Sequence, residues 1–124
     1  MYPKVATGNA EPVSFEQVLN GVQATRVVVV NAPNVVKTPR FQMVLAGVSA
    51  ASGGRAAGAA AAAGVAAIAD GWVNAFNAQV KSRFASESRV AVVDFYGELN
   101  KWLATPATYG LTNTTTPACP ITGQ

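Results

Sequence analysis

The sequence predicts an α/β protein in which two parallel strands are joined by a crossover helix. Two short valine-rich segments, at residues 26–31 and 89–93, flank a long segment with helical spacing. The first contains the run VVVV, which cannot alternate apolar and polar faces, and such strands are typical of parallel sheets covered by helices on both faces. Because strand–helix–strand connections are right-handed, the strands should be parallel neighbours, or near-neighbours, in one sheet. Two strands alone do not form a stable covered sheet, so the pattern indicates part of a larger one.

The composition favours a single domain and excludes several classes of partner. The chain has 124 residues, half of them apolar and 12% charged, which is sufficient for one modest core. Its net charge of +3 comes from scattered basic residues, so we expect no nucleic-acid-binding surface. The N-terminal residues contain no apolar signal region. The longest run of low polarity, 56–69, is shorter than the roughly 20 apolar residues of a membrane span, so we expect no membrane-spanning helix.

The chain is expected to begin with an irregular arm and a helix. Residues 1–13 contain two prolines and small polar residues, and predict an irregular N-terminal arm. The α/β domain then covers residues 14–104. Ser14 and Gln17 have the spacing of a capping box, and the apolar residues that follow fit a helix over 15–24, which leads into the first strand.

Between the first strand and the long helix we expect a loop, a short helix and a linker. Residues 31–40 contain two prolines and predict a loop. The apolar spacing over 41–48 predicts a short amphipathic helix. Residues 49–58 are rich in glycine, serine and alanine. They predict a mobile linker rather than a phosphate-binding loop, because no Lys-Ser/Thr pair follows the glycines.

The second half of the chain predicts two further helices and a terminal loop. A long helix is expected over 59–86, with an apolar stripe that packs in the core. The stripe consists of Val65, Ile68, Trp72, Phe76, Val80 and Phe84. After the second strand, Asp94 is placed to cap a helix that ends before Pro106. Residues 105–124, rich in threonine and proline, are expected to form a long loop.

Few residues are available for metal, cofactor or acid–base chemistry. The chain has one cysteine, Cys119, and no histidine, which is too few ligands for zinc, and no cofactor is expected. Cys119 has no second cysteine to pair with, so we expect self-association or a disulfide to another chain. Asp94 and Glu98 are four residues apart, but a helix cap and a solvated helix face account for them.

Three segments of the sequence resemble the GDSL (SGNH) ester hydrolases, a family of bacterial lipases and esterases. They are ATRVVVVNAPNVVKTP at 24–39, WVNAFNAQVKSRF at 72–84 and VAVVDFYGELNKWLATPATYGLTNTTTPAC at 90–119. The most specific signal is Tyr109-Gly110 followed by Thr-Asn and Thr-x-Pro-Ala-Cys spacing, ending at Cys119. The resemblance covers roughly residues 14–123.

This resemblance implies a partial flavodoxin-like three-layer α/β/α sandwich. The complete enzymes of this family have a Ser-His-Asp triad and an oxyanion hole formed by Gly and Asn. The Gly-Asp-Ser, Gly-x-Asn-Asp and Asp-x-x-His blocks that carry these groups are absent from the sequence. The chain therefore corresponds to the stretch between the Asn block and the Asp-x-x-His block, and we assign no catalytic residue and no metal ligand.

The loop after the first strand is the candidate site. In the implied fold, Asn31, Ala32, Pro33 and Asn34 form a wall of the ester-binding cleft, at the carboxyl edge of the sheet where ligands of α/β proteins bind. The alternative is that Asn31 and Asn34 only close backbone turns after the strand.

The expected function is therefore a partial carboxylic-ester hydrolase, inactive alone, which meets an ester substrate only when the missing segments complete it. The family's exported members suggest a secreted parent protein, although the N-terminus encodes no export signal. Two alternatives are a non-catalytic α/β binding or scaffold module and an enzyme with a Ser–Lys pair. For the second alternative, the sequence places no Ser–Lys pair in a strand-end loop. Ser82 is next to Lys81, but it is expected on a helix surface.

Overall fold

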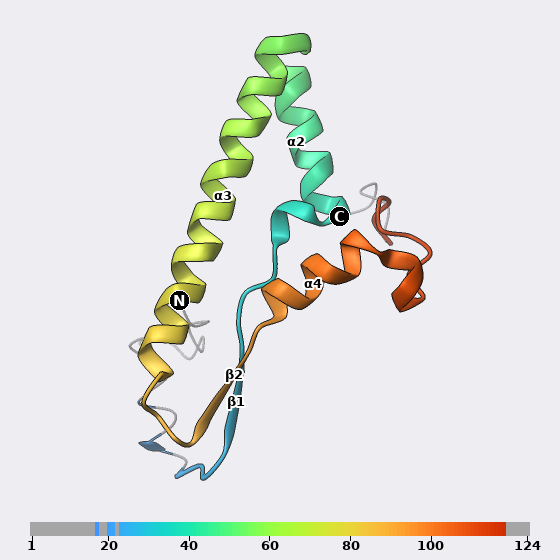
Figure 1. The fold of residues 1–124 in the computed structure, drawn as a ribbon. Helices are drawn as coiled ribbons and strands as arrows, with labels where there is room; N and C mark the ends of the chain where they lie inside the picture. The colour runs from blue at the N-terminus through green and yellow to red at the C-terminus, as the bar shows by residue number, and fades with distance from the viewer. Residues whose placement is uncertain (1–16, 18–19, 22, 119–124) are drawn as a thin grey trace, which may run out of the picture.

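The computed structural model describes residues 17, 20–21 and 23–118, and these have a mixed α/β fold (Figure 1). The elements follow in the order β1 (Val27–Val30), η1 (Val35–Lys37), α2 (Pro39–Ala51), α3 (Arg55–Phe84), β2 (Val90–Val93), α4 (Phe95–Ala104) and η2 (Pro106–Tyr109), where η denotes a short 3₁₀ helix. The predicted α/β class is confirmed at this level.

The two strands pair in parallel, as predicted. Their register runs from Val27 opposite Val90 to Val30 opposite Val93. At the ends of β1, the amide of Val27 donates to the carbonyl of Arg89 (2.7 Å) and the amide of Asn31 to that of Val93 (3.1 Å). The helix α3 makes the crossover between the strands, so the predicted strand–helix–strand unit is confirmed.

The crossover segment is a helical hairpin that extends well beyond the sheet. In Figure 1, α2 rises from the carboxyl end of β1 and packs antiparallel to the first half of α3. The second half of α3 returns along η1 and β2. The carboxyl edge of the sheet is therefore next to the base of the hairpin, where α4 also begins.

The connections around α2 are shorter than the sequence predicted. The predicted loop over 31–40 contains η1, and α2 begins at Pro39 because proline suits a first helical position and Thr38 caps it (Phe41 N to Thr38 Oγ1, 3.4 Å). The predicted mobile linker over 49–58 is wrong, because its alanines continue both helices. Only the turn 52–54 separates them, and Gly53 and Gly54 supply its positive φ values.

Burial is far lower than the apolar patterns predicted. Of the stripe on α3, only Val80 and Phe84 are buried, at the end that lies against the sheet, whereas Ile68, Trp72 and Phe76 are exposed. The valines of β1 were expected to be covered on both faces, but Val28 and Val30 are 66% and 56% exposed. Because paired residues in a parallel sheet share a face, these two valines lie on one face with Ala91 and Val93. Nothing in the described part of the chain covers that face.

Several predictions fall partly or wholly outside the described residues. The irregular arm over 1–13 and Cys119 lie outside them. Within the predicted helix over 15–24, the described residues Gln17, Asn20 and Gly21 are helical, whereas Gln23 and Ala24 are not. The loop predicted from residue 105 onward begins with η2 before its irregular part.

Gly58 tests how closely the hairpin helices approach each other. A Cβ at Gly58 would overlap the backbone carbonyl of Ser49 on α2, whereas a Cβ at Gly64 would meet no atom within 4 Å. We predict that Gly58→Ala lowers the free energy of unfolding by about 1–3 kcal/mol, because the two helices must separate. Gly64→Ala is the matched control and should raise it by about 0.5–1 kcal/mol. Urea unfolding followed by circular dichroism measures both, and equal effects at the two sites would contradict the close approach.

Candidate functional site

Asn31, the first residue after β1, joins the two strand ends and the start of α4. Its Nδ2 donates to Asp94 Oδ1 (2.9 Å), and its Oδ1 accepts from the amide of Tyr96 (2.9 Å). Asp94 Oδ1 also accepts from the amide of Gly97 (3.0 Å), so the predicted cap of α4 is confirmed. Two side chains from different strand ends thus satisfy amides in the first turn of α4, which helix starts leave without partners.

The next residue, Ala32, is held by α3. The amide of Ala32 donates to Asn77 Oδ1 (2.8 Å), and Asn77 Nδ2 donates to the carbonyl of Ala32 (2.8 Å). The Asn77 side-chain amide therefore pairs with both polar groups of one residue, in the way that a neighbouring strand would. We call this arrangement the Asn77–Ala32 pair. It fixes the loop against the C-terminal third of α3, which forms the crossover.

Asn34 is the buried polar residue of the loop. It is 6% exposed, and its Nδ2 donates to Asn100 Oδ1 (3.0 Å) and, over a longer distance, to the hydroxyl of Tyr96 (3.4 Å). Its Oδ1 has no hydrogen-bond partner among the described residues. Asn34 therefore anchors the far end of the loop to α4.

A polar chain links α4 to α3 above the loop. The hydroxyl of Tyr96 donates to Asp70 Oδ1 (2.9 Å), and Asn74 Nδ2 donates to Asp70 Oδ2 (3.0 Å) and to the Asp70 carbonyl (2.9 Å). Tyr96 thereby connects the Asp70 carboxyl group of α3 to the Asn34 side chain. The carboxyl edge of the sheet is consequently surrounded by amide, hydroxyl and carboxylate groups.

These groups surround an open hollow of about 450 Å³ between α3, the strand ends and α4. It is lined by Asn31, Asn74, Asn77, Ala78, Lys81, Val92, Asp94 and Tyr96. Lys81 brings the one cationic group of this lining, and Asp94 the one carboxylate. The volume is within the range of small-molecule sites, which are typically 300–1,000 Å³.

Asp94 is the lining residue with a shifted pKa. The hydrogen bond from Asn31, then that from the Gly97 amide, lowers the pKa of Asp94 from its ordinary value of 3.8, with weaker attraction from Lys101 and Lys81. Hydrogen bonds donated to a carboxylate favour its charged form. Asp94 is therefore an anionic helix cap at neutral pH and is poorly suited to donate a proton.

The lining of the hollow combines amide, hydroxyl, carboxylate and ammonium groups. The sequence contains no histidine, and no group of three or more potential metal ligands occurs within the described residues. Ser82 and Lys81 are both exposed, as expected for a helix surface. A serine nucleophile needs an oriented base within hydrogen-bond reach, and neither residue lies in a strand-end loop.

The loop residues predicted for the site are brought to the carboxyl edge, but they play unequal parts there. Asn31 alone of the four lines the hollow, while Ala32 is occupied by the Asn77–Ala32 pair and Asn34 is buried against α4. Sequence reasoning did not assign Asn77 or Tyr96 to the site. The Asn74–Asn77 spacing was a usable signal, because residues three apart lie on one helix face. Tyr96 gave none.

Comparison with family models, with curated proteins and with solved structures finds no match to this chain.

The Asn77–Ala32 pair can be tested by replacing the side-chain nitrogen of Asn77 with an oxygen. In Asn77→Asp the carboxylate still accepts from the Ala32 amide but faces the Ala32 carbonyl without a proton. We predict a loss of about 1–3 kcal/mol in the free energy of unfolding at pH 7, because a part-buried acceptor loses its donor. Gln79→Glu, an exposed amide-to-carboxylate change two residues away, is the matched control and should change it by less than about 0.5 kcal/mol. Equal losses in urea unfolding would refute the pairing.

Asp94 predicts a pH dependence of stability. A carboxylate whose pKa is lowered by folding contributes stability above its ordinary value, and this contribution is lost as pH falls through the folded-state pKa. Asp94→Asn should therefore be less stable than the parent chain at pH 7, with the difference shrinking below pH 3.8. Glu87, whose pKa hydrogen bonds from Arg89 lower to about 2, contributes acid sensitivity to both proteins alike. Urea midpoints at several pH values provide the measurement, and a difference that stays constant would contradict the assignment.

Proposed function

We propose that this chain is a partial carboxylic-ester hydrolase of GDSL/SGNH type, which forms one wall of an ester-binding cleft and does not hydrolyse esters alone. The observation that carries the proposal is the meeting of Asn31 and Asp94 at one edge. Two parallel valine strands end side by side there, and the hollow opens beside them. Ligands of α/β proteins bind beyond the carboxyl ends of parallel strands.

The unpaired edge of β1 supports the proposal that further strands complete the sheet. Val27 and Asn31 direct their amides toward β2, so the alternation of the ladder turns the amides of Val28 and Val30 away from it. These groups and the exposed face of Val28 and Val30 form an open, apolar sheet edge. Such an edge is normally paired or covered. Further strands and a second helical layer would complete a flavodoxin-like sandwich.

The absence of a triad from the sequence sets the limit on activity. Hydrolysis through an acyl-serine requires a base that takes the serine proton and returns it to the leaving group. With no histidine, only a lysine or a carboxylate could serve, and Asp94 is committed to capping α4. In this proposal the nucleophile, oxyanion hole and base come from segments that carry the missing blocks.

A second candidate is a non-catalytic α/β binding or scaffold module. This alternative is favoured because the polar groups at the carboxyl edge of the sheet are already hydrogen-bonded to other residues of the chain. The Asn77 amide is occupied at both atoms by Ala32, and Asn31 is occupied by Asp94 and Tyr96. Groups that are satisfied within the chain support a rigid framework more directly than they bind a substrate.

Hydrolysis of p-nitrophenyl butyrate by the purified chain, beside a mock-purified control, tests the proposal. We predict no rate above the control and no labelling by a serine-directed fluorophosphonate. Activity that persists after repurification would overturn the proposal and direct attention to a serine with a histidine-free mechanism.

Complementation separates the partial hydrolase from the module. Mixing the chain with a second chain that carries the Gly-Asp-Ser, Gly-x-Asn-Asp and Asp-x-x-His blocks should produce esterase activity if the first proposal is correct. Asn31→Ala should reduce that activity, because the strand ends would no longer be joined. If the two chains associate but remain inactive, the module is the better account.

A further inference from the structure

The α2–α3 hairpin has an unusual distribution of charge. Between residues 41 and 69 it contains one charged side chain, that of Arg55. Lys37 and Arg40 flank its base, and the first acidic residue after them is Asp70. Between residues 41 and 69 the hairpin is therefore mostly apolar, and the charged residues of this stretch and of the start of α2 are all positive.

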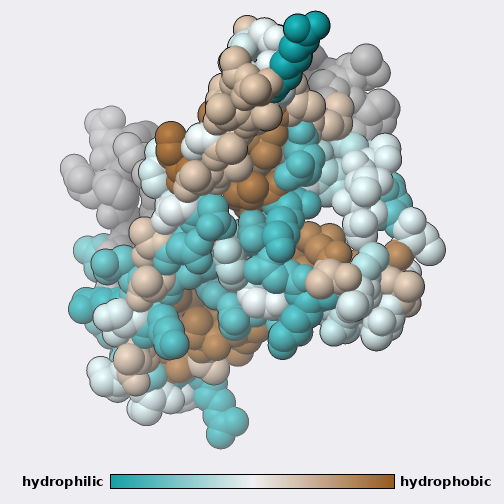
Figure 2. All heavy atoms as spheres, turned by 45° about the horizontal axis from the view of Figure 1, so that its top comes forward, coloured by the Kyte–Doolittle hydropathy of each residue, from teal (hydrophilic) through white to brown (hydrophobic). Residues whose placement is uncertain are grey.

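This apolar hairpin is exposed rather than packed in a core. The most apolar 18-residue stretch of α3 has a mean hydropathy of 1.4, yet only 6% of that stretch is buried. Trp72 and Ile68 are 74% and 54% exposed, and Met43 and Val44 on α2 are exposed as well. At the top of Figure 2, where the hairpin comes forward, most atoms are tan or brown and one teal side chain projects. A helix that is apolar all round is normally enclosed by a core or a membrane.

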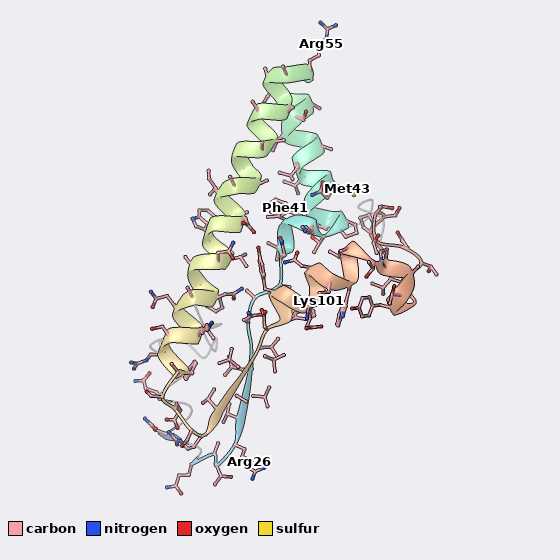
Figure 3. All side chains as sticks on the ribbon, viewed as in Figure 1. Arg26, Phe41, Met43, Arg55 and Lys101 are labelled. Carbon is pink, nitrogen blue, oxygen red and sulfur yellow. The ribbon has the colours of Figure 1, made fainter. Side chains whose placement is uncertain are left out.

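The hairpin is slightly shorter than the apolar part of a lipid bilayer is thick. Counting 1.5 Å per residue, α2 extends about 20 Å from the turn, and Trp72 lies about 25 Å from it along α3. The hydrocarbon core of a bilayer is about 30 Å thick. Because of this distance from the turn, Trp72 lies toward the base of the hairpin. If the turn pointed into the lipid, the indole ring would be at the level of the headgroups, where tryptophan is common. Arg55 projects from the turn, and Met43 lies on α2 between turn and base (Figure 3).

We propose that the α2–α3 hairpin is a lipid-binding element that inserts into a membrane carrying anionic headgroups. Apolar length alone is weak evidence, since core helices share it. Here the same residues are exposed, and Lys37 and Arg40 at the base of the hairpin complement a negative surface. Arg55, at the turn, would extend toward the headgroups of the opposite leaflet. The inference does not depend on the proposed ester hydrolase. The carboxyl edge of the sheet is next to the hairpin base, so insertion would bring the hollow close to the lipid surface.

Tryptophan fluorescence of the full chain with lipid vesicles tests this inference. Trp102→Phe leaves Trp72 as the only tryptophan, and phenylalanine keeps an aromatic ring against Phe95 and Tyr109. With vesicles of phosphatidylcholine and phosphatidylglycerol, Trp72 emission should shift to the blue and be quenched by brominated acyl chains. Vesicles of phosphatidylcholine alone should bind more weakly, because the cations then lack a partner.

Matched substitutions locate the binding surface. The double change Val44→Gln with Ile68→Gln should weaken vesicle binding about tenfold or more, measured by flotation. Val28→Gln with Val30→Gln, which changes two valines on the sheet that are more exposed than Val44 and Ile68, should leave it unchanged. Arg40→Gln, which removes an exposed cation at the base of the hairpin, should weaken binding to the anionic vesicles about fivefold.

Three outcomes would overturn the inference. The first is the absence of flotation and of any Trp72 shift with anionic vesicles. The second is an equal loss of binding in the sheet variant, because the hairpin would then not be the site. The third is a Trp72 that is already shielded without lipid in a dimer seen by analytical ultracentrifugation, since a second copy of the chain would then cover the hairpin.

Discussion

The arrangement of the strand ends depends on one pairing, that of the Asn77 side-chain amide with the backbone of Ala32. Two hydrogen bonds of 2.8 Å join residues that are 45 positions apart. They hold the loop after β1 against the crossover helix at the point where α3 reaches the sheet. Without this pairing the loop would carry a part-buried amide and carbonyl with no partner, which costs about 1–3 kcal/mol for each group.

Asn31 plays a similar part for α4, because its side-chain amide also holds a distant segment of the chain. Its side chain bonds to Asp94 and to the amide of Tyr96, so the cap of α4 is built by both strand ends rather than by one residue. Together with Asn34, it makes the edge a rigid polar frame around the hollow. A frame of this kind positions a ligand or another segment well, but its groups are already occupied. Under the proposed function it would therefore shape a cleft without taking part in the chemistry.

The sequence predicted the features that depend on neighbouring residues, and it failed where distant contacts decide. The strands, their parallel pairing and the Asp94 cap follow from local patterns of valines and from cap spacing. The linker over 49–58 was wrong because alanine favours the helix more strongly than the intervening glycines oppose it. The prediction that Trp72 and Val28 are buried was wrong. An apolar pattern identifies a face that could be covered, but it does not show which part of the chain covers it. The Asn74–Asn77 spacing marked a polar helix face, but the sequence did not show that Ala32 is the partner of Asn77, since the crossover alone brings the two together.

Native-state hydrogen exchange, read residue by residue by NMR, tests this account most directly. The amides of Ala32 and Tyr96 donate to side chains, and the account predicts slow exchange for both. The amides of Val28 and Val30 point away from β2, and it predicts fast exchange although both lie within a strand. Fast exchange at Ala32 and Tyr96, or strong protection at Val28 and Val30, would contradict an open sheet whose polar edge is held by Asn77 and Asn31.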